Sequence, residues 1–136
     1  MLAATIMVAV MSVFTACNKD DDNGGGSGSG IVGTWSGYDV EYPDDQIILV
    51  FNSDGTGSVT EIWYDYYGKK ETDTGNFTYS YSNNILTLVS KYYDDYYKKY
   101  ETDTDVIKCE IKGKTMYLYY EDDYYVEKLG YILTKQ

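Results

Sequence analysis

After residue 30, apolar and polar side chains alternate in short runs, and this alternation constrains the fold more than any other feature of the chain. It is clearest in Phe77-Thr78-Tyr79-Ser80-Tyr81, in Ile107-Lys108-Cys109-Glu110-Ile111 and in Met116-Tyr117-Leu118-Tyr119. A period of two residues places every second side chain on the same face of a β-strand, so each run has one face suited to a core. No run has the i, i+3, i+4, i+7 apolar spacing of a surface helix. The sequence therefore predicts an all-β fold.

Clusters of Asp, Asn, Gly and Lys divide the alternating runs from one another. We expect strands at 31–40, 46–51, 56–64, 75–81, 85–90, 101–111, 115–120 and 129–135. Strands joined in sequence in this way most simply form a single antiparallel up-and-down meander that closes into a small barrel of about eight strands. The interior of such a barrel can be filled by side chains or can hold one small ligand, so the fold class leaves both outcomes open.

The connections between these strands are of two kinds. The short ones carry the Gly or Asn that a turn position with positive φ requires, and they are 52–55, 82–84 and 112–114. In a meander these turns lie at one end of the barrel, so the longer connections lie together at the opposite end. The longer connections hold most of the Tyr-Tyr and Asp-Asp pairs, and they are 39–45, 65–74, 91–100 and 121–128.

Two of the long connections repeat each other. Tyr66-Tyr67-Gly68-Lys69-Lys70-Glu71-Thr72-Asp73-Thr74 returns 30 residues later as Tyr96-Tyr97-Lys98-Lys99-Tyr100-Glu101-Thr102-Asp103-Thr104. The spacing is that of one strand pair with its loops. Either a duplicated hairpin or a biased composition accounts for it.

Charge and composition exclude several classes of function. The formal net charge is -11, and all 11 basic residues are lysines. Such a surface repels nucleic acid, which needs basic patches. Because the chain has no histidine, nucleophilic catalysis lacks its usual base and zinc lacks its commonest ligand. Acidic pairs could in principle hydrolyse glycosides, but adjacent loop residues rarely face each other across a substrate. We therefore expect a protein that is not an enzyme.

We expect no cofactor, with weak calcium binding as the alternative. Calcium takes six to eight oxygen ligands, which acidic loops gathered at one rim could supply. The spacing of an EF-hand is absent from the chain. The plain alternative is that these acidic runs only keep the protein soluble.

The 18 tyrosines suggest a binding surface at the end with the long connections. Tyrosine combines a large rigid ring with one polar tip, which suits sugars and protein partners. In the alternative interpretation, half of each tyrosine pair packs inward while its neighbour shields the rim. The candidate ligand-binding residues are Tyr66, Tyr67, Tyr92, Tyr93, Asp94, Asp95, Tyr96, Tyr97, Tyr124 and Tyr125.

The first 30 residues predict where the protein is located. Residues 2–16 are uncharged and mostly apolar, yet too short to span a membrane, so we expect 1–16 to be a signal peptide. Phe14-Thr15-Ala16-Cys17 resembles the lipobox of bacterial lipoproteins, which implies that Cys17 is lipidated and becomes the first mature residue. Residues 17–30 then form a polar, glycine-rich tether, and 31–136 form the folded domain. Cys109 lies on an apolar face, where a buried free thiol is expected.

The residues after Cys17 indicate the face of the membrane to which the protein is attached. Asn18-Lys19-Asp20-Asp21-Asp22 is similar to the export signal that places lipoproteins on the outer face of the outer membrane in certain Gram-negative gut bacteria. An acidic spacer that is repelled by anionic headgroups is the alternative. We expect a protein anchored to the outer membrane by lipid and facing the cell exterior.

The domain itself resembles the small lipocalin-like domains of bacterial lipoproteins. The similarity rests on the order of its short motifs, which are Gly33-Thr34-Trp35, Phe51-Asn52-Ser53-Asp54-Gly55-Thr56-Gly57, Phe77-Thr78-Tyr79, Leu86-Thr87-Leu88 and Tyr131-Ile132-Leu133-Thr134. It implies a small antiparallel barrel, with Gly33 and Trp35 as structural residues of the closed end. True lipocalins pack an arginine over this tryptophan, whereas this chain has no arginine. The resemblance implies no catalytic residues.

These observations favour a lipid-anchored binding or accessory domain that presents its Tyr/Asp rim to an extracellular glycan or protein. One alternative is a carrier that holds a small apolar molecule inside the barrel. Another is a structural surface lipoprotein without a ligand.

Overall fold

The computed structural model describes residues 30–121, 124 and 126–136. The predicted signal peptide, Cys17, nearly all of the predicted tether and Tyr125 lie outside these residues. The described residues form eight β-strands and no helix. No helix in this part of the chain is long and apolar enough to cross a membrane.

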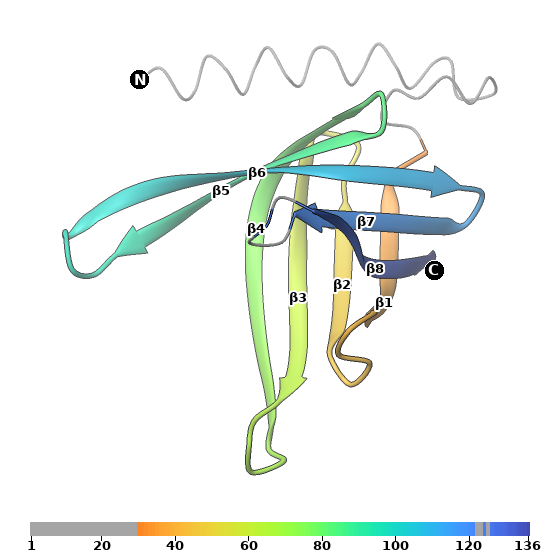
Figure 1. Cartoon of the computed structure of the whole chain (residues 1–136). Helices are drawn as coiled ribbons and strands as arrows, with labels where there is room; N and C mark the ends of the chain where they lie inside the picture. Colours follow the sequence, from red (N-terminus) through yellow and green to blue (C-terminus); the bar gives the residue numbers. More distant parts are fainter. Residues whose placement is uncertain (1–29, 122–123, 125) are drawn as a thin grey trace.

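The strands follow one another around a closed antiparallel barrel, in which β8 pairs with β1 (Figure 1). This confirms the predicted all-β meander. The strands are β1 (Gly33–Asp39), β2 (Gln46–Phe51), β3 (Thr56–Tyr64), β4 (Lys70–Ser82), β5 (Ile85–Asp94), β6 (Lys99–Lys112), β7 (Thr115–Glu121) and β8 (Glu127–Lys135).

The short connections lie at one end of the barrel and have the expected turn conformations. Asn83 and Asn84 both have positive φ, at 51° and 60°, as a two-residue hairpin turn requires. Gly55 and Gly113 supply positive φ in the other two turns, at 84° and 63°. We call this the closed end, and the opposite end the open end.

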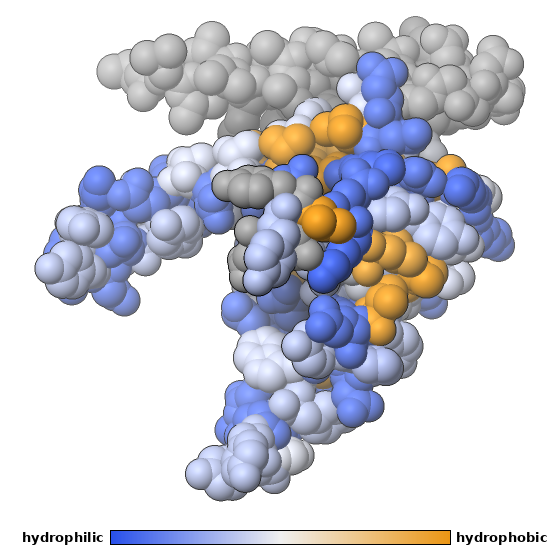
Figure 2. Space-filling view, viewed as in Figure 1, coloured by the Kyte–Doolittle hydropathy of each residue, from blue (hydrophilic) through white to orange (hydrophobic). Residues whose placement is uncertain are grey.

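The 65–74 and 91–100 connections differ from the prediction, because most of their residues are strand rather than loop. β4 begins at Lys70 and pairs with β3 down to Tyr64, and β5 and β6 continue to Asp94 and Lys99. Tyrosine and threonine favour strands, and cross-strand side-chain pairs extend both ladders to tight turns. These extensions form two arms that leave the barrel in different directions (Figure 1), and the space-filling view colours both arms mostly blue to white, in the hydrophilic half of the scale (Figure 2). We call them the β3–β4 arm and the β5–β6 arm.

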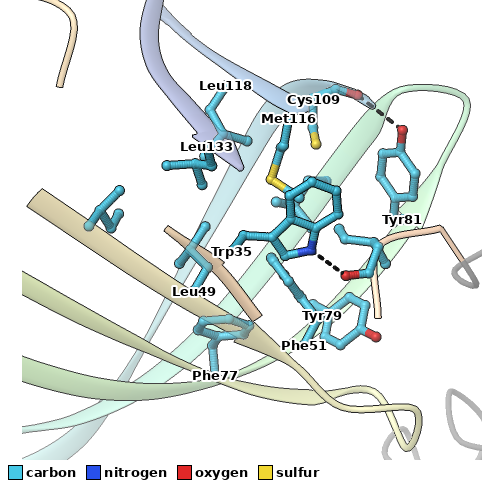
Figure 3. Close-up of a cluster of buried hydrophobic side chains, with 13 residues drawn as sticks. Trp35, Leu49, Phe51, Phe77, Tyr79, Tyr81, Cys109, Met116, Leu118 and Leu133 are labelled. Carbon is cyan, nitrogen blue, oxygen red and sulfur yellow. Dashed lines mark hydrogen bonds between the residues drawn. The ribbon is translucent and has the colours of Figure 1, made fainter. Parts of the chain in front are cut away.

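A hydrophobic core fills the closed half of the barrel. Trp35 lies at its centre and is fully buried, and its indole Nε1 donates a hydrogen bond to the carbonyl oxygen of Ile31 at 2.7 Å (Figure 3). The other buried members are Ile31, Ile47, Leu49, Phe51, Phe77, Tyr79, Tyr81, Leu86, Cys109, Met116, Leu118 and Leu133. Cys109 is a buried free thiol, as predicted.

Candidate functional site

The structure places the predicted tyrosine surface on the tips of two separate arms rather than on one rim. Tyr66 and Tyr67 lie at the tip of the β3–β4 arm and are 97% and 89% exposed. Tyr96 and Tyr97 lie at the tip of the β5–β6 arm and are 85% and 65% exposed. The two tips lie far apart in Figure 1, so one compact ligand cannot contact both pairs.

The remaining candidates lie on the β5–β6 arm or in the connection between β7 and β8. Tyr92 and Tyr93 lie on β5, and the Tyr93 ring packs edge-on against the Tyr100 ring at 5.2 Å between centroids. Tyr124 is exposed in the β7–β8 connection. Asp94 and Asp95 belong to the tip, where Asp94 Oδ1 accepts hydrogen bonds from the backbone N–H groups of Tyr96 and Tyr97.

The two arm tips have nearly the same construction, as the sequence repeat indicates. The Tyr66 and Tyr67 rings meet edge-to-face at 5.5 Å, and the Tyr96 and Tyr97 rings do so at 4.9 Å. In each tip an aspartate oxygen accepts hydrogen bonds from backbone N–H groups of the turn. Each arm also has a lysine paired with the glutamate two residues later, Lys69 with Glu71 at 2.6 Å and Lys99 with Glu101 at 2.7 Å.

The departure of the arms splits the barrel wall at the open end. β4 pairs with β5 only as far as the Phe77 and Ser90 pair, and its earlier residues pair with β3 alone. In the same way, β6 pairs with β7 only as far as the Lys108 and Tyr119 pair. Two seams, at which neighbouring strands are no longer paired, therefore begin beyond these points.

A cavity of about 730 Å³ occupies this open half, next to the core. Its volume lies within the range of pockets that bind small molecules. Ile47, Leu49 and Leu118 are buried at its floor, and the lining residues Val59, Leu88 and Ile107 pack against the same core. The apolar lining includes Ile47, Leu49, Val59, Leu88, Ile107 and Leu118.

The lining changes from apolar to acidic toward the open end. On β3 the residues on the inner face run from Gly57 through Val59 to Glu61, since these three pair with inward-facing residues of β2. On β6 the inner face runs from Ile107 to Asp105, which pairs with Leu88. Glu61 and Asp105 are both exposed at the mouth of the cavity.

Lys108 bridges the seam between β6 and β7. Its Nζ lies 2.6 Å from Glu127 Oε1 on β8 and 3.8 Å from Glu110 Oε1, and it lies 4.7 Å from the centroid of the Tyr119 ring. The hydrogen bond to Glu127 is the largest cause that raises the pKa of Lys108, so this side chain is held in its charged form. The Lys108 ammonium is thus already paired with two carboxylates of the same chain.

A smaller cavity of about 270 Å³ adjoins the first, since Ile47, Glu61 and Tyr131 line both. Its other lining residues include Asp45 and Trp63. Burial and, to a smaller extent, the carboxylates of Asp39, Glu61 and Asp45 raise the pKa of Tyr131 to about 12. The Tyr131 hydroxyl therefore stays protonated as a hydrogen-bond donor surrounded by carboxylates.

The closed end is sealed, and Gly33 and Trp35 lie there as the sequence predicts. The ammonium of Lys135 lies 5.2 Å from the centroid of the Trp35 ring, where it covers the indole. This lysine occupies the position for which the resemblance to lipocalins expects an arginine. At Gly33, φ is 131°, and a Cβ atom would come within 2.9 Å of the Lys135 side chain. Glycine at this position lets the lysine reach the ring.

Among the described residues, no three Asp, Glu, Cys or His side chains are arranged to hold a metal ion. Calcium binding at the acidic loops therefore stays a prediction without support from the geometry.

Sequence reasoning missed the polar residues at the mouth of the cavity, which are Glu61, Trp63, Asp105 and Tyr131. A signal for them was present, because they continue the alternation of β3, β6 and β8 on the inward face. The binding residues predicted from the sequence were instead the adjacent Tyr-Tyr and Asp-Asp pairs. The predicted doublets belong to the arms and loops, whereas Glu61, Trp63, Asp105 and Tyr131 are single residues within the barrel strands.

No protein-family model, curated protein or solved structure matches this chain.

Proposed function

We propose that this protein is a lipid-anchored, non-enzymatic domain of the lipocalin-like type that binds a small, largely apolar molecule in the open half of its barrel. The observation that carries the proposal is the cavity of about 730 Å³ next to the core. Burial of apolar ligand surface against its floor would supply the driving force, at about 25 cal/mol per Å².

A cavity-filling variant tests this proposal. Leu88→Trp adds a bulky ring to the lining, whereas Val89→Trp adds the same ring to the next residue of β5, which alternation places on the outer face. We expect the uncharged apolar fluorophore 1-N-phenylnaphthylamine to bind the parent protein and Val89→Trp with enhanced emission. Binding should be lost in Leu88→Trp, while circular dichroism verifies that both variants remain folded. A parent protein that gives no enhancement, or equal binding by both variants, would contradict the proposal.

A second candidate function is recognition of an extracellular glycan or protein by the two arm tips. It is favoured by the matching construction of the tips, each with an exposed edge-to-face tyrosine pair. Two equivalent weak sites on one molecule gain affinity for a partner that presents the recognised group repeatedly.

This second candidate is tested by Tyr67→Ala and Tyr97→Ala, alone and combined, on glycan arrays and against candidate surface proteins. Each single variant should already lose the gain in affinity that two arms provide together, and the double variant should abolish the remaining binding. Tyr38→Ala removes an exposed tyrosine of β1 and serves as the control. If the parent protein retains no glycan or protein, or if the double variant binds as the parent does, the arms have no such role.

A further inference from the structure

The two adjoining cavities provide two chemically different environments for one ligand. The larger cavity has the apolar floor, and the smaller one lies between Asp45, Glu61, Trp63 and Tyr131. Because Ile47, Glu61 and Tyr131 line both cavities, a single molecule can extend from one into the other. The arrangement suits a ligand with an apolar body and a polar head.

The net charge of the side chains that line the larger cavity determines whether the polar head of the ligand is positive or negative. The larger cavity is lined by four carboxylates, those of Glu61, Asp105, Glu121 and Glu127, and by the single ammonium of Lys108, which gives a formal net charge of -3. Lys108 is paired with Glu127 and Glu110. Glu61, Asp105 and Glu121 have no ion-pair partner in the described ranges. Charges of one sign beside a low-dielectric wall attract a cation and repel an anionic head such as a carboxylate.

An aromatic ring beside these carboxylates points to an organic cation independently of the charges. Trp63 lines the smaller cavity together with Glu61, and its side chain is 36% exposed, so a ligand can reach the ring. The face of an indole attracts ammonium groups more strongly than the face of any other side-chain ring. Carboxylates, an indole and a phenol around one small cavity are together suited to an alkylammonium group.

We propose that the joined cavities bind an amphiphilic organic cation, with its apolar body against Val59 and Leu88 and its ammonium group between Glu61, Asp45 and Trp63. The inference rests on the proposed function, since it specifies the ligand class of the same cavity. It separates this barrel from one that carries fatty acids or other anionic lipids.

Three probes of equal chain length separate the two proposals. Decyltrimethylammonium, decanol and decyl sulfate carry the same apolar chain with a positive, neutral or negative head. Isothermal titration calorimetry below the micellar concentrations should give an affinity for the cation about tenfold higher than for decanol, with decyl sulfate weakest. Added sodium chloride should reduce the advantage of the cation and leave decanol binding unchanged.

Variants that remove one carboxylate or the indole ring then show where the head group of the ligand binds. Glu61→Gln and Trp63→Leu should each lower the affinity for the cation by about threefold to tenfold, without changing the affinity for decanol. Glu101→Gln removes a negative charge from the β5–β6 arm, where neither Glu101 nor its ion-pair partner Lys99 lines either cavity, and it should leave all three affinities unchanged.

The outcomes distinguish failure of the inference from failure of the proposed function. If decanol binds but the cation binds no more tightly, or if decyl sulfate binds best, the proposed function stands and the cation inference is wrong. If neither decanol nor the cation binds, the proposed function itself is overturned. If Glu61→Gln and Glu101→Gln reduce cation binding equally, the attraction comes from the net charge of the protein and not from this site, which also contradicts the inference.

Discussion

Two tyrosines hold the closed half of the barrel together through hydroxyl groups that remain neutral. The Tyr79 hydroxyl donates a hydrogen bond to the carbonyl oxygen of Asn52 at 2.7 Å, and the Tyr81 hydroxyl donates one to the carbonyl oxygen of Cys109 at 3.2 Å. Burial is the main cause that raises the pKa of each to about 12. The two rings thus occupy core positions from which their hydroxyl groups tie β4 to the backbone of the 52–55 turn and of β6.

The raised pKa values of Tyr79 and Tyr81 make the stability of the protein dependent on alkaline pH. In the unfolded chain a tyrosine loses its proton near the ordinary pKa of 10.0, whereas these two keep theirs to about pH 12 when folded. Between these values the unfolded state binds fewer protons, so the contribution of these two tyrosines to the free energy of unfolding is constant below about pH 10 and falls from there to about pH 12. The raised pKa values of Tyr131 and Cys109 add a fall of the same sign, which begins near pH 9 for the thiol. Urea denaturation from pH 8 to pH 11.5 measures this fall.

The variants Tyr79→Phe and Tyr66→Phe identify the source of that dependence. Tyr79→Phe should be less stable at pH 8 by about 1 kcal/mol, because a hydrogen bond is lost, and its stability should fall less steeply above pH 10. Tyr66→Phe changes an exposed ring and should follow the parent curve. Equal slopes for Tyr79→Phe and the parent protein would show that the fall has another origin.

The two arms show where local sequence patterns predict an element and where they do not. The strands of the barrel could be predicted because one face of each is apolar, as in β2 with buried Ile47, Leu49 and Phe51. The same criterion failed for the arms, since both faces of a two-stranded ribbon are exposed to solvent and no apolar alternation is required. Doubled tyrosines and charged residues then resemble a loop, although cross-strand pairs such as Tyr93 with Tyr100 hold a ladder.

The exposure of the arm tips predicts that their tyrosines contribute little to folding. Tyr67→Ala and Tyr97→Ala should each change the free energy of unfolding by less than about 0.5 kcal/mol in urea denaturation, because both rings are largely exposed. Tyr79→Ala, at 2% exposure, is the matched core variant and should cost about 3 kcal/mol or more. Unfolding of the domain by both tip variants would mean that these rings are core, and the proposed recognition by the arms would then fail.

At the scale of the whole molecule, the chain enters β1 at one end of the barrel and the cavity opens at the other end. β1 begins at Gly33 beside the tight turns, and its residues run from the sealed end around Trp35 toward the open end. The arms and the mouth of the cavity lie at the opposite end. An anchor attached upstream of Gly33 would therefore leave the mouth facing away from the surface to which the protein is attached.

The proposed anchor is tested by Cys17→Ala expressed in cells of a Gram-negative host. We expect the parent protein to sediment with the membrane fraction and the variant to appear in the soluble fraction, because the lipid-bearing thiol is removed. Cys109→Ala is the control, since that thiol is buried in the core and carries no lipid. Membrane retention of Cys17→Ala equal to that of the parent protein would refute lipidation at this residue.

The closed meander and its two ends were predictable from the sequence, whereas the cavity was not. Turn residues such as Asn83, Asn84 and Gly113 fix which connections are short, and these in turn fix which end is closed. Whether side chains fill the open half depends on where β4 leaves β5 and β6 leaves β7, and these limits arise from contacts among strands distant in sequence. A pattern of single residues contains no such information.

The pairing of β1 with β8 determines when the protein can fold. The register joins Trp35 to Lys135 and Asp39 to Tyr131, so the sheet keeps two unpaired edges until the last strand is present. Contacts of such long sequence separation slow folding, since the loop between them must close first. The barrel is therefore completed only after the final strand has been synthesised, because β8 supplies the partner for both β1 and β7.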